Sequence, residues 1–394
     1  MEFFRNTNID FLGRKWYFLA FSLIFSVAGI LSMLFWHGIP LGVEFKGGTQ
    51  VRVKFTQPPD DNQLRAAMDR AGLHNARIQR YGAVANNEVL ISLELKETSE
   101  ANNQGKELIM KALNPNPPQG KRDLNNVGVD TLRETLATRD PLHLAPQEYA
   151  AIARQILEFR DLQRGGVLKS LDELQGAVPA AALDALKQDF FVSGFSSPGS
   201  STVGPQVGAQ LRTQAILATL YSLLGMLIYL WFRFEMIYGV AAVVAVFHDT
   251  LITIGAFSLT NKEITLTVIA AILTLVGYSM NDTIVVFDRI RENVKMMRRE
   301  SLAEIVNRSI NQTLSRTILT SGLTFVTVLS LYLFGGEVLN GFSFALVIGI
   351  IIGTYSSIAV AAPMLVAYQD WRTGRRALAP VPAQAGPGKA RVKV

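Results

Sequence analysis

Cysteine is absent from this 394-residue sequence, and its four histidines are scattered. Without cysteine there are no disulfides or thiolate sites, so any domain outside the cytoplasm must fold on its core alone. Four scattered histidines do not favour a metal site. No glycine-rich loop is followed by Lys-Ser or Lys-Thr, the nucleotide-binding signature. We therefore expect no cofactor, no metal and no enzyme activity, and an energy source that is ionic or supplied by a partner.

Charged residues are also scarce, at 18%, whereas hydrophobic residues make up 49%. This composition is too apolar for an ordinary soluble protein and indicates an integral membrane protein in the lipid bilayer. The net charge is +6. Its basic residues lie beside apolar runs and in the tail, as orientation signals do, so we expect no nucleic acid partner.

Six apolar runs have the length of a membrane-spanning helix. The first follows Arg14 and Lys15 and has no cleavage pattern after it, which predicts an uncleaved signal anchor. The six predicted spans cover residues 16–36, 213–232, 236–259, 264–287, 317–334 and 342–368.

Basic residues predict the orientation of these spans. They gather before the first span, between the fourth and fifth, and after the last, whereas loops 260–263 and 335–341 carry almost none. Because cytoplasmic loops are enriched in Lys and Arg, we expect both termini in the cytoplasm. The residues concerned are Arg5, Arg14, Lys15, Arg289, Arg291, Lys295, Arg298, Arg299, Arg308, Arg372, Arg375 and Arg376. Residues 371–394 form a basic cytoplasmic tail, disordered from about 380.

Residues 38–211 have a soluble composition and predict one domain outside the cytoplasm. Alternating apolar residues predict a strand at 50–55 and another at 88–95. A helix is expected at 60–71, with Asp60 or Asp61 as its N-cap, and a second near 105–113. Together these elements predict a small α+β sandwich between the first span (1–37) and the remaining spans (212–370).

The centre of this domain departs from that pattern. Prolines at 115, 117 and 118 break it, and residues 131–184 then read as mostly helical. We interpret about 115–191 as a helical insertion, which either contacts a partner or decorates the surface; we favour decoration. Residues 196–201, rich in Ser, Pro and Gly, are expected to be a linker back to the membrane.

Polar residues inside three of the spans are the candidate functional site. His248 and Asp249 lie in the third span, Asn281 and Asp282 in the fourth. A carboxylate near the middle of a spanning helix costs about 2.5–3.5 kcal/mol on insertion scales. It therefore persists where a partner pairs with it, a proton neutralises it or water hydrates it.

Asp288 near the end of the fourth span and Arg316 at the start of the fifth would extend these groups into a staggered relay for protons or cations. Structural roles without proton transfer are alternatives for some of these residues. Asp288 and Arg289 fit charges that flank a membrane, Arg316 fits an anchor that snorkels to the interface, and His248 fits a local hydrogen-bond partner. Gly349 and Gly353 in the sixth span predict close helix packing.

Seven segments together resemble SecF, a family of protein-export membrane subunits within the SecD/SecF group and the RND superfamily. They cover both ends of the soluble domain and all six spans. They are LGVEFKGGT at 41–49, VGPQVG at 203–208, FRFE at 232–235, FHD at 247–249, GYSMNDTIVVFDRIREN at 277–293, SRT at 315–317 and LFGG at 333–336.

The resemblance implies an α-helical membrane protein with six transmembrane helices, half of an RND-type bundle, and one periplasmic ferredoxin-like domain. It implies SecD as the partner that supplies six more spans, and association with the SecYEG channel in the bacterial inner membrane. An aspartate of span 4 and an arginine of span 5 serve proton conduction in the family, and they fall here on Asp282 and Arg316, with Asp249 in a neighbouring motif. The long segment at 115–191 departs from the family's compact periplasmic domain.

The function expected from these features is coupling of the proton motive force to motion of the periplasmic domain, which promotes translocation of a preprotein. One alternative is a small-molecule or lipid exporter of the RND type, although one modest domain and six spans leave little room for a drug pocket. A second alternative is a structural assembly subunit, for which Asp282 and Arg316 would be replaceable. Neither the coupling ion, H⁺ or Na⁺, nor the role of the insertion follows from the sequence.

Overall fold

A computed structural model describes residues 7–82, 84–94, 101–297 and 299–377. Arg5, Arg298 and most of the predicted tail, from residue 378, lie outside the described residues. The chain divides into two compact units. One comprises residues 1–40, 217–335 and 339–394, and the other residues 41–216 with 336–338. Each unit is described by itself.

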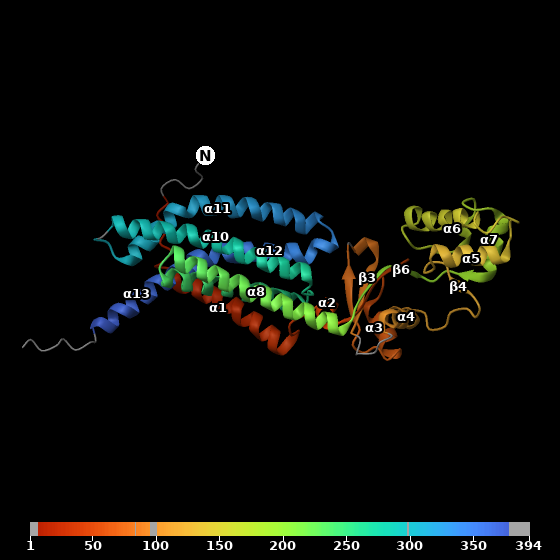
Figure 1. Cartoon of the computed structure of the whole chain (residues 1–394), viewed down its shortest axis with the longest axis horizontal. Coiled ribbons are helices and arrows are strands. Elements are labelled where there is room, and N and C mark those ends of the chain that lie inside the picture. The colour runs from red at the N-terminus through yellow and green to blue at the C-terminus, as the bar shows by residue number, and fades with distance from the viewer. Residues whose placement is uncertain (1–6, 83, 95–100, 298, 378–394) are drawn as a thin grey trace, which may run out of the picture. The chain divides into compact units, whose positions relative to one another are not determined.

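The first unit is a bundle built from six helices long and apolar enough to cross a membrane, the number that the sequence predicts (Figure 1). The helices are α1 (Lys15–Leu31) with a π-helical end (Ser32–Trp36), α8 (Pro205–Arg233), α9 (Met236–Thr260), α10 (Leu266–Met296), α11 (Leu302–Phe334), and α12 (Glu337–Ser356), which continues through a π-helix, η5 (Ser357–Ala361), into α13 (Ala362–Ala377).

Helix α11 starts well before the predicted fifth span. Its first turn is closed by a capping box, in which the Ser301 hydroxyl accepts from the Glu304 amide and the Glu304 carboxylate accepts from the Ser301 amide. The expectation that Arg316 begins the fifth helix is therefore wrong. The helix starts before the apolar run on which the prediction rested, because polar residues such as Asn307 and Gln312 are also helical. Arg316 lies in the interior of α11.

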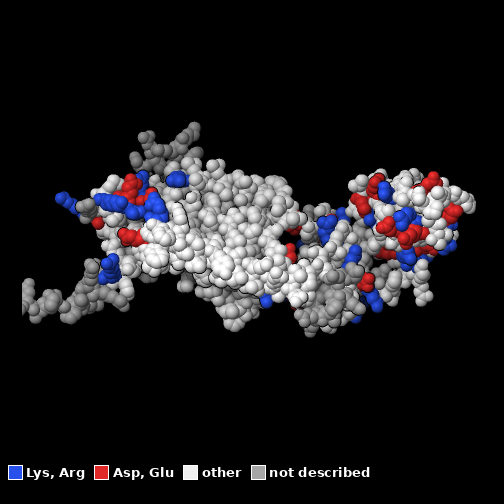
Figure 2. All heavy atoms as spheres, viewed as in Figure 1, with Lys and Arg blue, Asp and Glu red and all other residues white. Residues whose placement is uncertain are grey.

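Small residues bring the bundle helices into close contact. Helix α10 packs against α9 and α11. A side chain on Gly349 of α12 would overlap Leu275 of α10, and one on Gly353 would press on Ser279, so the predicted packing role of these glycines is confirmed. Charged side chains visible in Figure 2 gather at one end of the bundle, and most of its visible flank carries none.

The second unit contains a four-stranded antiparallel sheet in the order β2-β3-β1-β6, with two helices. Val51, Val53, Val89 and Ile91 alternate along β1 and β3 and form its core with Met68 and Ile109 of the helices. The elements are β1 (Gly48–Phe55), α3 (Asp61–Arg70), β2 (Arg77–Tyr81), β3 (Glu88–Leu93), α4 (Ala101–Leu113) and β6 (Phe195–Val203).

The predictions for this sheet are largely confirmed at β1, α3, β3 and α4. Asp60 caps α3, because its side chain accepts a hydrogen bond of 2.9 Å from the Asn62 amide. Strand β2 had not been predicted, since its Arg-Ile-Gln-Arg-Tyr sequence carries a single aliphatic residue. A weakly apolar strand such as this is recognised by its pairing with β3, which its own sequence pattern does not show.

Residues 196–201 are not a linker, and that expectation is wrong. They belong to strand β6, which pairs with β1 from Gly48 opposite Val203 to Phe55 opposite Phe195. A register shift lies between Arg52 and Lys54, beside Pro198, which has no amide hydrogen to donate. Serine and glycine in this segment give no apolar alternation. The strand forms because its backbone pairs with the backbone amides and carbonyls at the edge of β1.

The predicted helical insertion is present and has its own core. Leu132, Leu136, Tyr149, Ile156 and Leu186 are completely or almost completely buried within it. Short strands β4 (Arg122–Asp123) and β5 (Phe190–Phe191) pair in parallel and bring its two ends together. Between them lie α5 (Val129–Arg139), α6 (Tyr149–Glu158), a π-helix (Phe159–Gln163), a 3₁₀-helix (Leu171–Leu174) and α7 (Ala180–Asp189).

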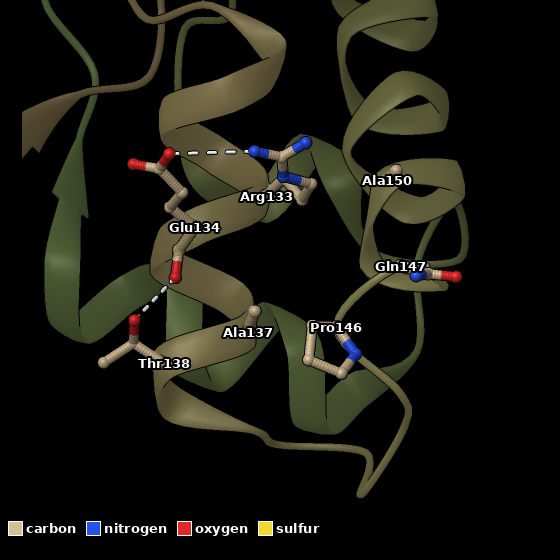
Figure 3. A pocket seen from close by; sticks show the side chains of 7 residues that line it. All are labelled: Arg133, Glu134, Ala137, Thr138, Pro146, Gln147 and Ala150. Carbon is tan, nitrogen blue, oxygen red and sulfur yellow. Dashed lines mark hydrogen bonds and ion pairs between the residues drawn. The ribbon is translucent and has the colours of Figure 1, made fainter.

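A shallow groove of about 520 Å³ lies between α5 and α6 of this insertion (Figure 3). The groove is open because small side chains line it, among them Ala137 and Ala150. Arg133 and Glu134 form an ion pair at its rim. Nothing in the groove is both charged and unpaired, and its walls present no buried polar group to a ligand.

Candidate functional site

Asp249 of α9 is completely buried among three helices. Its carboxylate accepts hydrogen bonds on one oxygen from Ser279 Oγ of α10 (2.6 Å) and from Ser356 Oγ of α12 (2.7 Å). The other oxygen lies 3.0 Å from Nδ1 of His248. The carboxylate thus links α9, α10 and α12, and His248 is its local hydrogen-bond partner.

Asp282 of α10 is 3% exposed and faces α11. Its carboxylate accepts a hydrogen bond of 2.8 Å from Ser321 Oγ of that helix. Ser279, the partner of Asp249, precedes Asp282 by three residues, so the two side chains are neighbours on α10. The structure therefore places the two predicted carboxylates on two neighbouring helices, Asp249 on α9 and Asp282 on α10, and each accepts hydrogen bonds from serines of other helices.

The remaining predicted residues lie on exposed faces of the bundle. Asn281 and Asp288 are seven residues apart on α10 and share one face. Arg316 is also exposed, and within the described part of the chain its side chain forms no ion pair or hydrogen bond with Asp282. A continuous relay through all five residues is thus not formed by direct contacts in this chain alone.

Sequence reasoning had not assigned a role to the serines of this site, Ser279, Ser321 and Ser356. Hydroxyls in apolar helices commonly bond to their own backbone four residues earlier, as Thr253 and Thr283 do here. No local signal separates such residues from those that reach another helix. The carboxylate partners could be identified only from helix packing.

Further polar atoms are buried in the bundle near these carboxylates. His248 Nε2, Tyr278 OH, Thr317 Oγ1 and Thr354 Oγ1 have no hydrogen-bond partner among the described residues. Buried polar atoms that stay unpaired are costly, so this region has hydrogen-bonding capacity beyond its protein contacts. The described residues contain no cluster of three or more His, Asp or Glu side chains that could hold a metal ion.

The two motifs at the ends of the second unit meet in space. Gly47 and Gly48 adopt positive φ angles of +78° and +150°. A β-carbon on Gly47 would lie 2.5 Å from Cα of Pro205, and one on Gly208 would lie 2.8 Å from the Gly47 amide nitrogen. Glycine is therefore required for the first strand of the sheet to pack against the start of α8.

Comparison with known proteins explains these features. The family profile described as "Protein export membrane protein SecD/SecF, C-terminal" matches residues 185–371, and the "SecD/SecF GG Motif" matches residues 34–59, which include Gly47 and Gly48. Protein translocase subunit SecF of Koribacter versatilis is 67% identical over all of both chains. That of Calditerrivibrio nitroreducens is 37% identical over 94% of this chain and 98% of its own.

Solved structures of SecDF, described for Thermus thermophilus as a translocon-associated membrane protein, are also similar. One shares 30% identity with a TM-score of 0.64 and matches 93% of this chain, and a second, in a super-membrane-facing form, shares 31% with a TM-score of 0.55 over 95%. This chain spans about two fifths of the length of these SecDF chains, at 39% and 40%. With full-length matches to SecF subunits, it belongs to the SecD/SecF family of protein-export membrane proteins, as a SecF-type protein translocase subunit of the Sec pathway.

Proposed function

We propose that this chain couples the proton motive force to polypeptide translocation through its intramembrane carboxylates. The observation that carries the proposal is the burial of Asp249 and Asp282, each held by serine hydroxyls of neighbouring helices. A carboxylate that gains or loses a proton changes what these serines bond to, and so changes the packing of α9, α10, α11 and α12. Arg316 would act on Asp282 through its charge.

The energy available to such a site is sufficient to drive a domain motion. One elementary charge that crosses a potential of 100 mV yields about 2.3 kcal/mol, which shifts a two-state equilibrium about fiftyfold. The unpartnered polar atoms near the carboxylates support access by water, through which the ion would move.

Gly47 supports a mechanical route for this energy within the second unit. Gly47, the residue before the first strand of the sheet, packs on Pro205, the first residue of α8, and α8 continues as one helix into the bundle. Displacement of α8 would therefore act directly on the sheet. The element order β-α-β-β-α-β and the strand order β2-β3-β1-β6 support a ferredoxin-like fold for this sheet.

We infer the orientation from the basic residues. Arg14, Lys15 and the segment between α10 and α11 would face the cytoplasm, with both termini, in the bacterial inner membrane. The second unit would then be periplasmic, where it would hold the emerging preprotein, and the SecYEG channel would be the complex with which the chain associates.

SecD is the proposed partner that completes the bundle. This chain matches about two fifths of a SecDF chain, so a separate SecD subunit would supply further helices. The docking face is supported by an exposed stripe on α10 made of small or polar residues, Ala270, Thr274, Gly277 and Asn281. Small residues allow helices to approach closely in membranes, where lipid gives no hydrophobic force between them. The SecF relatives give no support to the small-molecule exporter.

The test replaces each carboxylate by its isosteric amide, Asp282→Asn and Asp249→Asn, in cells that depend on this chain and carry its SecD partner. We expect secretion of a reporter protein and ion flow across the membrane to fall together, by about tenfold or more. Copurification of SecD provides the control for assembly. Wild-type export by Asp282→Asn would refute the coupling role and leave a structural subunit; wild-type export by Asp249→Asn would remove Asp249 from the relay.

A further inference from the structure

An open groove of about 650 Å³ lies within the second unit, where the base of the helical insertion meets α4. Its walls are partly apolar. Met110 comes from α4, Pro115 and Pro117 from the loop that enters the insertion, and Phe191 and Phe195 from the strands that leave it. Proline and aromatic surfaces are rigid, whereas methionine adapts to varied apolar side chains. The groove can therefore accept apolar groups of different shapes.

Lysines line the groove with unpaired positive charge. Lys106 and Lys111 of α4 form no ion pair with any described residue. Lys121 lines the groove as well, and its ammonium group donates to the backbone oxygen of Lys187. Of the two carboxylates in the lining, Glu107 is exposed and Asp123 is already occupied by hydrogen bonds. With three lysines and two carboxylates, the lining carries a net positive charge, which favours an occupant that carries negative charge.

Hydrogen bonds hold the insertion side of the groove in place. The Asp123 carboxylate accepts from the backbone amides of Asn125 (3.1 Å) and Ser193 (3.0 Å), and from the Asn126 side chain. Asn126 also donates to the Phe195 carbonyl (3.2 Å) and accepts from the Ser197 amide (2.8 Å). Both chain crossings of the insertion are therefore fastened to β6, and binding would require little ordering of this wall.

We propose that this groove binds an extended segment of unfolded polypeptide in which acidic residues stand next to apolar ones. The proposal rests on the proposed function, since a translocating preprotein is the unfolded chain that this domain would meet. Apolar side chains of the segment pack on Met110 and Phe191, and its carboxylates pair with Lys106 and Lys111. The insertion thus has a binding role in addition to its place on the surface.

The test measures peptide binding to the full chain in lipid nanodiscs. The probes are two fluorescent unstructured peptides of equal apolar content, one with glutamates and one with lysines at the same positions, followed by anisotropy. We expect the acidic peptide to bind more tightly, and Lys106→Glu/Lys111→Glu to weaken it about tenfold while improving the basic peptide. High salt should weaken the acidic peptide, because exposed charges are screened.

The matched control is Arg154→Glu/Lys169→Glu, which makes the same charge change at two exposed residues of the insertion outside the groove. Equal loss of binding in both double variants would overturn the proposal, as would displacement of the acidic peptide by anionic lipid vesicles. Reporter export is measured in parallel in cells depleted of the wild-type chain. If export requires the chain but peptide binding is unchanged by Lys106→Glu/Lys111→Glu, only the groove assignment fails. If export does not require the chain, the proposed function fails.

Discussion

Single residues in this protein act through the partners that their surroundings give them. Asp249 and Asp282 are both aspartates in apolar helices, yet Asp249 has two serines and a histidine as hydrogen-bond partners, whereas Asp282 has one serine. Asp282 is thus the less firmly held of the two. We infer that Asp282 changes its partners first, while Asp249 ties α9 to α12.

A carboxylate outside the membrane shows how a partner controls titration. Arg139 at the end of α5 donates two hydrogen bonds, of 2.7 and 2.6 Å, to Asp189 at the end of α7. These hydrogen bonds hold the pKa of Asp189 below its ordinary value. The pair therefore stabilises the insertion at every pH above the unfolded value of about 3.9, and this stability is lost as the pH falls through the lower folded value.

We predict that Asp189→Asn increases hydrogen exchange of the α5 and α7 amides at pH 7 and has little effect at pH 2. The measurement is exchange by mass spectrometry, corrected for the intrinsic rate at each pH. Asp184→Asn serves as the control, since Asp184 is exposed on the same helix and forms no ion pair in the described structure. An equal effect of Asp189→Asn at both pH values would show that the carboxylate charge is not responsible.

At the scale of elements, the protein depends on places where backbones touch. Helices α1 and α9 cross with Gly29 against Gly255, where a β-carbon on either would lie within 3 Å of the opposite Cα. One turn further, Ser32 and Ser258 share a hydrogen bond of 2.8 Å. The sheet meets the start of α8 in the same way, at Gly47. At each of these contacts the backbone of one element lies directly against the backbone of another.

We predict that Gly47→Ala uncouples the sheet from α8. The backbone of Gly47, at φ +78° and ψ +142°, is one that residues with a β-carbon rarely adopt, and that carbon would overlap the backbone of Pro205. Export of the reporter should fall severalfold while the bundle still inserts and binds SecD. Gly72→Ala is the matched control, because Gly72 has a similar φ of +77° with open space around it. An equal loss of reporter export in both variants would show that backbone strain alone causes the effect.

At the scale of the whole molecule, the bundle has the composition of a part of a larger assembly. Its α10 helix turns Ser279 toward Asp249 of α9 and Asp282 toward Ser321 of α11, and exposes a stripe of small and polar residues elsewhere. Asn281 and Asp288, which the sequence placed in the relay, lie on this exposed face. Contacts with a second set of helices would bury them, which agrees with a relay shared between two subunits.

We predict that Gly277→Leu prevents stable association with SecD without unfolding this chain. A β-carbon at Gly277 meets nothing within 4 Å, so the leucine is tolerated inside the bundle but fills the proposed docking face. The measurement is copurification of tagged SecD from membranes, with the amount of inserted chain determined alongside. Gly225→Leu, at an exposed and equally open glycine of α8, is the control. Normal copurification by Gly277→Leu would remove this face as the SecD contact.

Local features of the sequence were enough to predict the number of spans and an aspartate cap at Asp60 or Asp61, of which the structure selects Asp60. Helix length, hydrophobicity and capping depend on residues a few positions apart, and the lipid solvent demands about twenty apolar residues for each span. The buried aspartates were found for the same reason, because a carboxylate in an apolar run is conspicuous wherever its partner lies. The domain borders, the membrane orientation and the roles of the site residues stay predictions.

Only the tertiary structure decided which partners these residues have. Strand β6 looked like a linker because serine and glycine carry no apolar alternation, and its pairing with β1 joins residues about 150 apart in the chain. Ser279, Ser321 and Ser356 likewise resemble hydroxyls that bond to their own helix. Hydrogen bonds between distant segments pair polar groups that have no partner nearby in the sequence, so these pairs are determined by how the elements pack. The spans, by contrast, are determined by local composition.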